Sequence, residues 1–226
     1  TGFAGVAEAA ADMLISALKD SQLSHGRVTD LGCGSGTLAR KLLDQGYAVE
    51  GIDQSDSMLA LARSHAPNAV FRHESLLECE IPPSIAVCAI GESFNYLFDR
   101  NNNDEALDRV LHRVHQSLES GGILMFDIAT PDRITKAPAK TFYNTQNWTT
   151  LVENIHLETP MMMTRKISYF IKDGVNFERV DETHHLRLID PDKLAHLVNT
   201  QSLDVEMFEC YGPEPLPAGS TGFCAY

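Results

Sequence analysis

The chain has 226 residues, with 31 Asp and Glu against 18 Lys and Arg, which gives a net charge of −13 at pH 7. This length predicts one well-packed α/β domain with an elaboration rather than two domains. The acidic balance argues against a duplex nucleic-acid partner, which needs a basic face, and the apolar runs fall short of the roughly 20 residues that span a bilayer.

The cysteine and histidine residues indicate which cellular compartment to expect and whether to expect a metal site. The five cysteines include no C-x-x-C pair, which is typical of a reducing compartment, so we expect a cytoplasmic protein. No metal site is predicted, because the adjacent His184 and His185 would point to opposite faces of a strand. The first residue is threonine, and we expect further residues to precede it.

The first ninety residues alternate between helical and strand patterns. An apolar stripe from Val6 to Leu18 predicts an amphipathic helix that ends near Lys19. Strands are predicted at 27–31, 48–53, 69–72 and 84–90, the last of them apolar enough for a central strand. Two further helices are predicted, one at 37–45 and one that Ser55 or Asp56 caps.

The loop between the first strand and the second helix contains V-T-D-L-G-C-G-S-G-T-L, residues 28–38. Gly32, Gly34 and Gly36 have no side chain to hold a ligand away, so backbone N–H groups can approach a polar ligand closely. Asp30 adds a carboxylate, which would repel a pyrophosphate and attract an ammonium group. Asp53, seventeen residues after Gly36, ends the second strand, where it can accept both hydroxyls of a ribose.

In this order, the D-x-G-x-G-x-G loop, the acid after the second strand and Met58 on the following helix resemble the class I S-adenosylmethionine-dependent methyltransferases. The resemblance implies S-adenosylmethionine as the cofactor. It also implies a set of cofactor-binding residues from the loop, the second strand end, the next helix, the H-E-S-L-L segment and the central strand end: Asp30, Gly32, Cys33, Gly34, Gly36, Asp53, Gln54, Met58, Ser75, Leu76, Ile90 and Gly91.

Two of these positions need comment. We interpret Cys33 as packing against the cofactor rather than as a nucleophile. Ser75 stands where the family more commonly has an aspartate that bonds the adenine amino group. Ser75, the neighbouring Glu74 or a backbone N–H could take that role.

Two other functions stay open at this point. A nicotinamide-dependent oxidoreductase has a similar loop and acid, but the third glycine of G-x-G-x-x-G should then fall where Thr37 stands. A non-catalytic cofactor-binding module is the second alternative. The absence of an obvious catalytic base does not distinguish it, because many methyltransferases need none.

The second half of the chain adds a helix, more strands and an inserted sheet. A helix is predicted at 104–118, ending at Gly121-Gly122, followed by a strand at 122–128. Beyond Pro131 we predict three antiparallel strands at 148–158, 162–171 and 177–188, with a turn at Asp173-Gly174. A helix then begins at Asp190-Pro191, and strands at 203–211 and 222–226 complete the chain.

These elements predict an α/β fold: a Rossmann-like, doubly wound mixed sheet of seven strands, the last one antiparallel, with a small antiparallel β insertion after strand five. We expect a single methyltransferase domain over 1–226. Its parts would be a cofactor-binding core at 1–130, an inserted β-sheet subdomain or lid at 131–189, and a return to the core sheet at 190–226. The segments G-E-S-F-N-Y-L-F-D and Y-G-P-E-P-L-P resemble bacterial small-molecule methyltransferases with such an insertion, including amine and sugar-amine N-methyltransferases.

The predicted reaction is methyl transfer to a small molecule, with an amine favoured over a hydroxyl or a carboxylate. Glu92 follows Gly91 and could orient an amine or remove its proton, or it could be an ordinary loop acid. The other acceptor candidates lie at the same sheet edge or in the insertion: Asn95, Tyr96, Asp127, Tyr143, Trp148, Tyr169 and His185. We expect no nucleic-acid or membrane partner and a monomer or homodimer.

Overall fold

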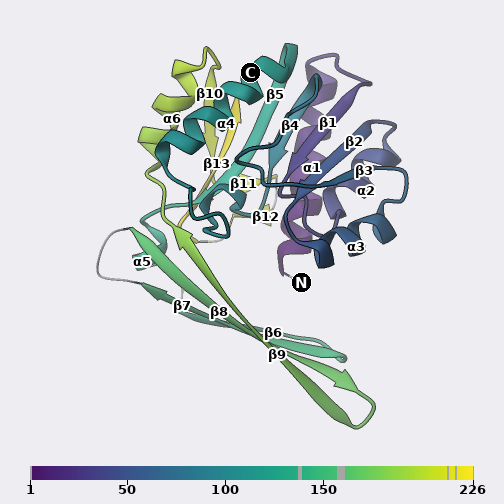
Figure 1. Cartoon of the computed structure of the whole chain (residues 1–226), viewed down its shortest axis with the longest axis vertical. Coiled ribbons are helices and arrows are strands. Elements are labelled where there is room, and N and C mark those ends of the chain that lie inside the picture. Colours follow the sequence, from purple (N-terminus) through teal and green to yellow (C-terminus); the bar gives the residue numbers. More distant parts are fainter. Residues whose placement is uncertain (1, 137–138, 157–160, 213, 217, 226) are drawn as a thin grey trace.

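The computed structural model describes residues 2–136, 139–156, 161–212, 214–216 and 218–225. A seven-stranded mixed sheet forms the core, and a four-stranded antiparallel sheet projects from one end of it (Figure 1). The core sheet has the strand order β10-β13-β5-β4-β1-β2-β3. In chain order these strands are β1 (Arg27–Leu31), β2 (Ala48–Asp53), β3 (Val70–His73), β4 (Ser84–Ala89), β5 (Leu118–Ala129), β10 (Val205–Phe208) and β13 (Ser220–Ala225).

The strand directions agree with the sequence prediction. β1 pairs in parallel with β2 and β4, β2 with β3, and β4 with β5. β13 runs antiparallel between β5 and β10. The expected seven-stranded mixed sheet with its last strand antiparallel is therefore confirmed.

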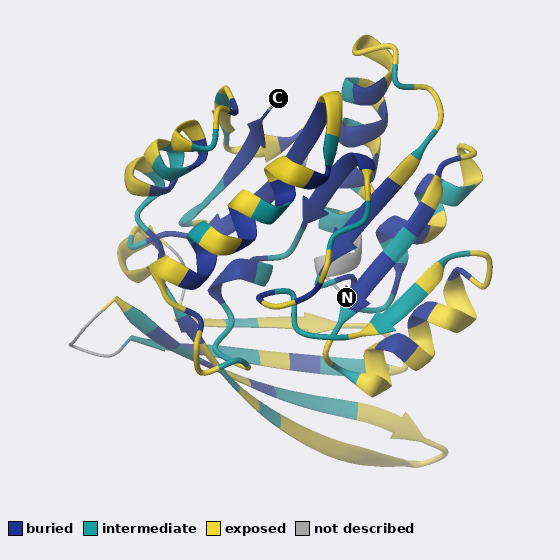
Figure 2. Ribbon diagram, turned by 45° about the horizontal axis from the view of Figure 1, so that its top comes forward, coloured by how far each residue is buried: buried dark blue, intermediate teal, exposed yellow. Residues whose placement is uncertain are grey.

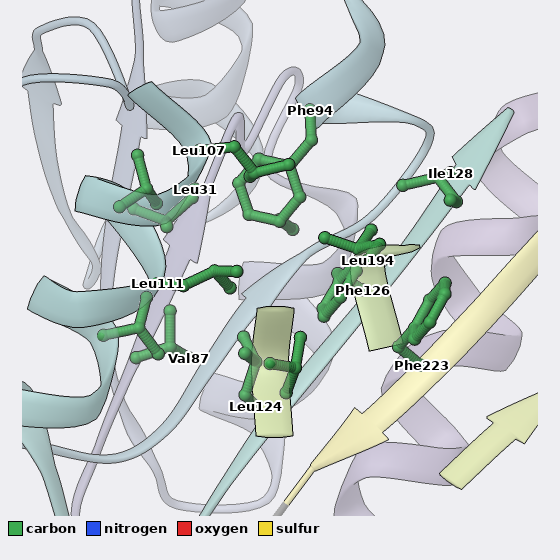
Figure 3. Close-up of a cluster of buried hydrophobic side chains, with 14 of the residues drawn as sticks. Leu31, Val87, Phe94, Leu107, Leu111, Leu124, Phe126, Ile128, Leu194 and Phe223 are labelled. Carbon is green, nitrogen blue, oxygen red and sulfur yellow. The ribbon is translucent and has the colours of Figure 1, made fainter. Parts of the chain in front are cut away.

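Helices cover both faces of the core sheet. α1 (Gly2–Asp20) and α2 (Thr37–Asp44) pack on one face, where Leu14 and Leu42 belong to the same buried cluster as Met125. α4 (Asp104–Ser117) and α6 (Pro191–Thr200) pack on the other face. Figure 3 shows that second cluster, in which the rings of Phe126 and Phe223 stack with centroids 4.8 Å apart. Burial of this kind on both faces explains why β4, which is buried along its whole length, is apolar after Ser84.

Capping residues start the helices where the sequence predicts. The Ser55 hydroxyl accepts from the Met58 N–H at 3.4 Å and caps α3 (Asp56–His65). Asn103 caps α4 through the Ala106 N–H at 2.8 Å, and Asp190 caps α6. α4 ends at Ser117 and β5 begins at Leu118, so the predicted strand at 122–128 begins too late. Hydrogen bonding to β4 from Leu118 onward extends the strand beyond its apolar stretch.

The inserted sheet has the strand order β6-β7-β8-β9. Its strands are β6 (Lys140–Asn144), β7 (Trp148–His156), β8 (Met162–Asp173) and β9 (Asn176–Arg187). The prediction of three strands is wrong by one, because the short edge strand β6 is mostly exposed and lacks an apolar alternation. The turn predicted at Asp173-Gly174 is confirmed, with Gly174 at φ 60°. Positions 157–158 of one predicted strand and 226 of another lie outside the described residues.

Short elements connect these parts. They are the 3-10 turn η1 (Ser93–Asn95), the one-turn helix α5 (Arg133–Lys136), and the small pair β11 (Cys210–Tyr211) and β12 (Glu214–Pro215). The far half of the β8-β9 hairpin is exposed, whereas the half beside the core is partly buried (Figure 2). None of the helices in the described part of the chain is long and apolar enough to cross a membrane.

Candidate functional site

A cleft of about 740 Å³ lies at the carboxyl ends of β1, β2 and β4, and the inner face of the inserted sheet forms its far wall. This is the edge at which ligands bind in open α/β sheets. Most of the residues predicted for the cofactor line this one cleft: Asp30, Gly32, Cys33, Gly34, Asp53, Gln54, Met58, Ser75, Leu76, Ile90 and Gly91.

The glycine loop is shaped by left-handed backbone and by close contacts. Gly32, Gly34 and Gly36 have φ values of 76°, 52° and 75°, which L side chains rarely adopt. A Cβ on Gly32 would lie 2.6 Å from the Ser93 hydroxyl oxygen. Gly36 does not line the cleft, and its prediction as a contact needs correction. A Cβ there would lie 3.0 Å from Ala62, so this glycine instead lets α2 begin against α3.

The two aspartates of the loop region lie in different surroundings. Asp53 accepts hydrogen bonds from the Gly34 N–H at 2.9 Å and from the Ser55 N–H at 2.8 Å, which fix its carboxylate at the end of β2. Asp30 is buried, and burial raises its pKa to about 7, assisted by the nearby Asp53 charge and opposed by a hydrogen bond from the Cys88 thiol. A cationic ligand beside Asp30 would therefore stabilise its charged carboxylate.

The surroundings of the Cys33 thiol disfavour its ionised form. Its pKa is raised well above the ordinary value, first by burial and then by the charges of Asp30 and Asp53. A thiolate is the reactive form of cysteine, so this environment suppresses reactivity. The interpretation of Cys33 as a packing residue stays a prediction.

The next part of the cleft contains an acid that the sequence analysis missed. The Ser75 hydroxyl donates to the Asp99 carboxylate at 3.1 Å, and both residues line the cleft. Glu74 also lines it, but Arg72 holds that carboxylate through two nitrogens at 2.9 and 2.6 Å. Asp99 follows β4 by ten residues, in an irregular loop that has no periodic pattern to reveal it.

Glu92 does not line the cleft, so the prediction that it faces the reacting methyl group needs correction. Its side chain is only 1% exposed. Arg133 and Ser220 contact one carboxylate oxygen, and Arg165 donates to the other at 3.0 Å. Two guanidinium groups thus hold the carboxylate, which leaves it no role as a proton acceptor for a substrate.

Asn95 and Asp127 are also buried rather than directed into the cleft. The Asn95 amide nitrogen donates to the Ala129 carbonyl at 2.8 Å and to the Arg187 carbonyl at 2.7 Å, which joins β5 to β9. Asp127 accepts from the Gly91 N–H at 2.9 Å and from the Tyr211 hydroxyl at 2.9 Å. Burial raises the Asp127 pKa to about 6. Both side chains hold the loop after β4 in place.

The inserted sheet contributes a different set of residues from the predicted one. Tyr96 and Tyr169 line the cleft as predicted positions, but Tyr143 and Trp148 do not. His185 lies on the opposite face, where Thr164 contacts its ring at 3.1 Å, and its neighbour His184 lines the cleft instead. The opposite orientation of this histidine pair was expected from strand geometry, and only the register of β9 shows which of them faces the core.

Further cleft residues come from the loop after β4 and from the inserted sheet. Phe98 stacks on Tyr96 with ring centroids 5.0 Å apart, and His184 meets both rings edge-on at 5.6 and 5.2 Å. Glu182 and Ile167 stand opposite each other on β9 and β8. Side chains alternate along β9, so Glu182 could have been expected on the same face as His184. Nothing comparable in the sequence indicates Phe98.

Known proteins that are similar to this chain are named as methyltransferases. A family model described as a methyltransferase domain matches residues 28–122. YqeM of Bacillus subtilis (strain 168), named provisionally as a methyltransferase, is 26% identical over 76% of this chain and 71% of that protein. The dTDP-3-amino-3,6-dideoxy-alpha-D-glucopyranose N,N-dimethyltransferase of Streptomyces fradiae is 24% identical over 85% of this chain and 72% of that protein.

The fold is shared with a solved structure over almost its whole length. An S-adenosylmethionine-dependent methyltransferase from Clostridium acetobutylicum ATCC 824 superposes with a TM-score of 0.81 at 19% identity, covering 96% of this chain and 90% of that chain. The similarity therefore includes the core sheet and the inserted sheet together.

Proposed function

Since the chain belongs to the class I S-adenosylmethionine-dependent methyltransferases, we propose that it methylates the nitrogen of a small amine. The enzyme uses S-adenosylmethionine, which supplies an electrophilic methyl group when bound. We do not retain the other two hypotheses, a nicotinamide-dependent oxidoreductase and a non-catalytic binding module. The glycine loop on which all three hypotheses depend lies inside the region that matches the methyltransferase family model.

The residues present fit this cofactor. Asp30 is a buried carboxylate whose neighbours are a thiol and a second acid. An ammonium group bound there would offset the cost of burying its negative charge. Gly32 and Gly34 add no side chain to the cleft, although their N–H groups already bond the Ile52 carbonyl and the Asp53 carboxylate. Asp53 is held at the strand end by two N–H groups. We assign the methionine end to Asp30 and the glycine loop, the ribose to Asp53, and the adenosine surroundings to Gln54, Met58, Ser75 and Leu76.

One observation supports an amine acceptor more than any other. Among the described residues that line the cleft there are five carboxylate side chains and no Lys or Arg. A negative potential in a concave, low-dielectric site favours cationic ligands and disfavours carboxylates and phosphates. The amine acceptor of the Streptomyces fradiae relative and the rings of Tyr96 and Phe98, which can face a cation, support the same choice.

The chain's own part in catalysis is placement and exclusion of water. An amine that binds as its ammonium ion attacks only after it has lost a proton, and alignment of the resulting lone pair can supply a large share of the rate enhancement. The inserted sheet walls the cleft, and we propose that it acts as the acceptor-side cover. We also propose that residues 131–189 form a subdomain, inserted between a cofactor-binding core at 1–130 and a segment at 190–226 that returns to the core sheet.

A competition among matched acceptors tests this function. The protein is incubated with S-adenosylmethionine and sets of amines, alcohols and carboxylates that share one carbon skeleton, and S-adenosylhomocysteine is measured by mass spectrometry. We expect product above the acceptor-free background with amines, and background values with the matched alcohols and acids. Methylation of only the alcohols or only the acids would refute the proposal.

A further inference from the structure

The inner face of the inserted sheet carries a polar cluster that the cofactor does not need. Tyr169 on β8 and Glu182 and His184 on β9 line the cleft together. The register pairs Tyr169 with Val180, and Glu182 with Ile167. Glu182 is thus a diagonal neighbour of Tyr169 on the same face.

Two neutral groups hold the Glu182 carboxylate. The Tyr169 side chain is close enough to feel the Glu182 charge, and burial together with that charge raises the Tyr169 pKa to about 12. His184 Nε2 lies 3.3 Å from a Glu182 oxygen. His184 Nδ1 is buried with no hydrogen-bond partner among the described residues. The neutral ring therefore places its proton on Nε2, facing Glu182, and its lone pair on Nδ1.

The groups around His184 keep it neutral and leave the charge of Glu182 in place. Burial lowers the His184 pKa, and the nearby Arg165 and His185 lower it further, whereas Glu182 raises it. The ring of Tyr96, from the loop after β4, also lies beside His184, with ring centroids 5.6 Å apart. The Arg165 guanidinium donates to Glu92, to Asn154 and to the Tyr96 hydroxyl.

The cluster is fixed in position against the cofactor side of the cleft. The Leu97 N–H donates to the His185 carbonyl at 2.8 Å, and Tyr96 forms a bridge with Leu186. The same loop contains Ser93, whose side chain borders Gly32. The loop after β4 thus connects the glycine loop to the Glu182 cluster in a few residues.

We propose that Glu182, oriented by Tyr169 and His184, is the carboxylate that binds the positively charged group of the methyl acceptor and selects it over neutral analogues. This inference rests on the proposed amine specificity. Other cleft acids are engaged differently: Glu74 by Arg72, Asp53 by two backbone N–H groups, and Asp99 by Ser75. Glu182 is 40% exposed and faces the acceptor side of the cleft.

Binding of a charged probe and its neutral isostere tests the assignment without turnover. The protein saturated with S-adenosylhomocysteine is titrated with benzylamine and with benzyl alcohol, and the dissociation constants are measured by ligand-observed NMR. We expect the wild-type protein to prefer benzylamine by roughly tenfold, and Glu182→Gln to reduce that preference to about twofold or less. Glu182→Asp, which keeps the charge, should retain part of the preference.

Glu178→Gln is the matched control, because Glu178 lies on the same strand and face, opposite Ile171, but outside the cleft. It should behave as wild type, and S-adenosylhomocysteine affinity should be unchanged in every variant. A Glu182→Gln protein that keeps the preference would overturn the assignment and leave the amine function standing. Loss of S-adenosylhomocysteine affinity in that variant would also overturn it. A wild-type protein without any preference would overturn the amine function itself.

Discussion

Asp30 and Asp53 show how two carboxylates a short distance apart acquire different properties. Asp53 is satisfied by backbone N–H groups at 2.9 and 2.8 Å. Asp30 is buried beside Cys88, with its pKa raised to about 7. Without a ligand, the surroundings of Asp30 therefore disfavour its charged form. A cationic group bound beside Asp30 would stabilise that charge.

This difference predicts the behaviour of an Asp30→Asn variant. A folded-state pKa raised from 3.8 to about 7 destabilises the folded ligand-free protein as the pH rises between those values. The variant should therefore gain stability relative to wild type by up to about 4 kcal/mol on going from pH 4 to pH 8. Urea unfolding at the two pH values measures this. A stability difference that does not change with pH would contradict it, and the variant should bind S-adenosylhomocysteine more weakly.

Adjacent residues of the inserted sheet show how one position decides a role. His184 faces the cleft and His185 faces away, although both sit in the same polar stretch of β9. Side chains alternate between the two faces of a strand, so a shift of one residue exchanges them. The sequence predicts the alternation but does not contain the register, which the pairing of β9 with β8 and the bridge at Leu186 establish.

At the scale of elements, the buried Glu92 joins four parts of the fold. It connects the loop after β4 to α5 through Arg133, to β8 through Arg165, and to β13 through Ser220. Burial, followed by the charge of Arg165, lowers the Arg133 pKa to about 9. The network therefore fastens the inserted sheet to the core and positions the wall of the cleft.

Removal of this one carboxylate should be costly. Glu92→Gln leaves two buried guanidinium groups without their counter-charge and should lower the free energy of unfolding by about 3–5 kcal/mol. Hydrogen exchange should accelerate in the β8 and β9 segments next to the core. Glu153→Gln is the control from the same sheet, because its ion pair with Lys140 is exposed and such pairs contribute at most about 1 kcal/mol. Equal effects of the two substitutions would refute the bridging role.

At the scale of the whole molecule, the cleft lies between two bodies of different construction. Residues at the ends of the core strands line one side of the cleft, and residues of β8 and β9 line the other. Figure 1 shows the sheet that contains β8 and β9 projecting from one end of the core. The net charge of −13 and the acidic cleft lining act in the same direction on a charged ligand. The cytoplasmic location and the choice between monomer and homodimer stay predictions.

Ligand binding should register in the stability of the whole chain. S-adenosylhomocysteine at about 100 times its dissociation constant adds about 2.7 kcal/mol to the folded state. For a chain of 226 residues this corresponds to a rise in Tm of roughly 5–10 °C. Differential scanning fluorimetry measures the shift, and NADH at the same concentration should leave Tm unchanged. A shift with NADH and none with S-adenosylhomocysteine would contradict the cofactor assignment.

The sequence by itself determined the features that depend on local backbone chemistry. Glycines that must adopt positive φ, acids at strand ends and helix caps such as Ser55 each act within a few residues of the chain. These features predicted the core sheet, the cofactor and most of the residues that line the cleft. The length of the chain likewise determined its size, and the counts of charged residues determined its net charge.

The tertiary structure alone decided which polar groups meet across the fold. Glu92 and Arg165 are 73 positions apart, and nothing near either residue shows that they pair in the interior. Asn95 and Asp127 were expected in the cleft because they share its sheet edge, yet long-range hydrogen bonds turn both inward. The part of the cleft wall formed by Tyr169, Glu182 and His184 depends likewise on strand register and docking, which are properties of the folded chain as a whole.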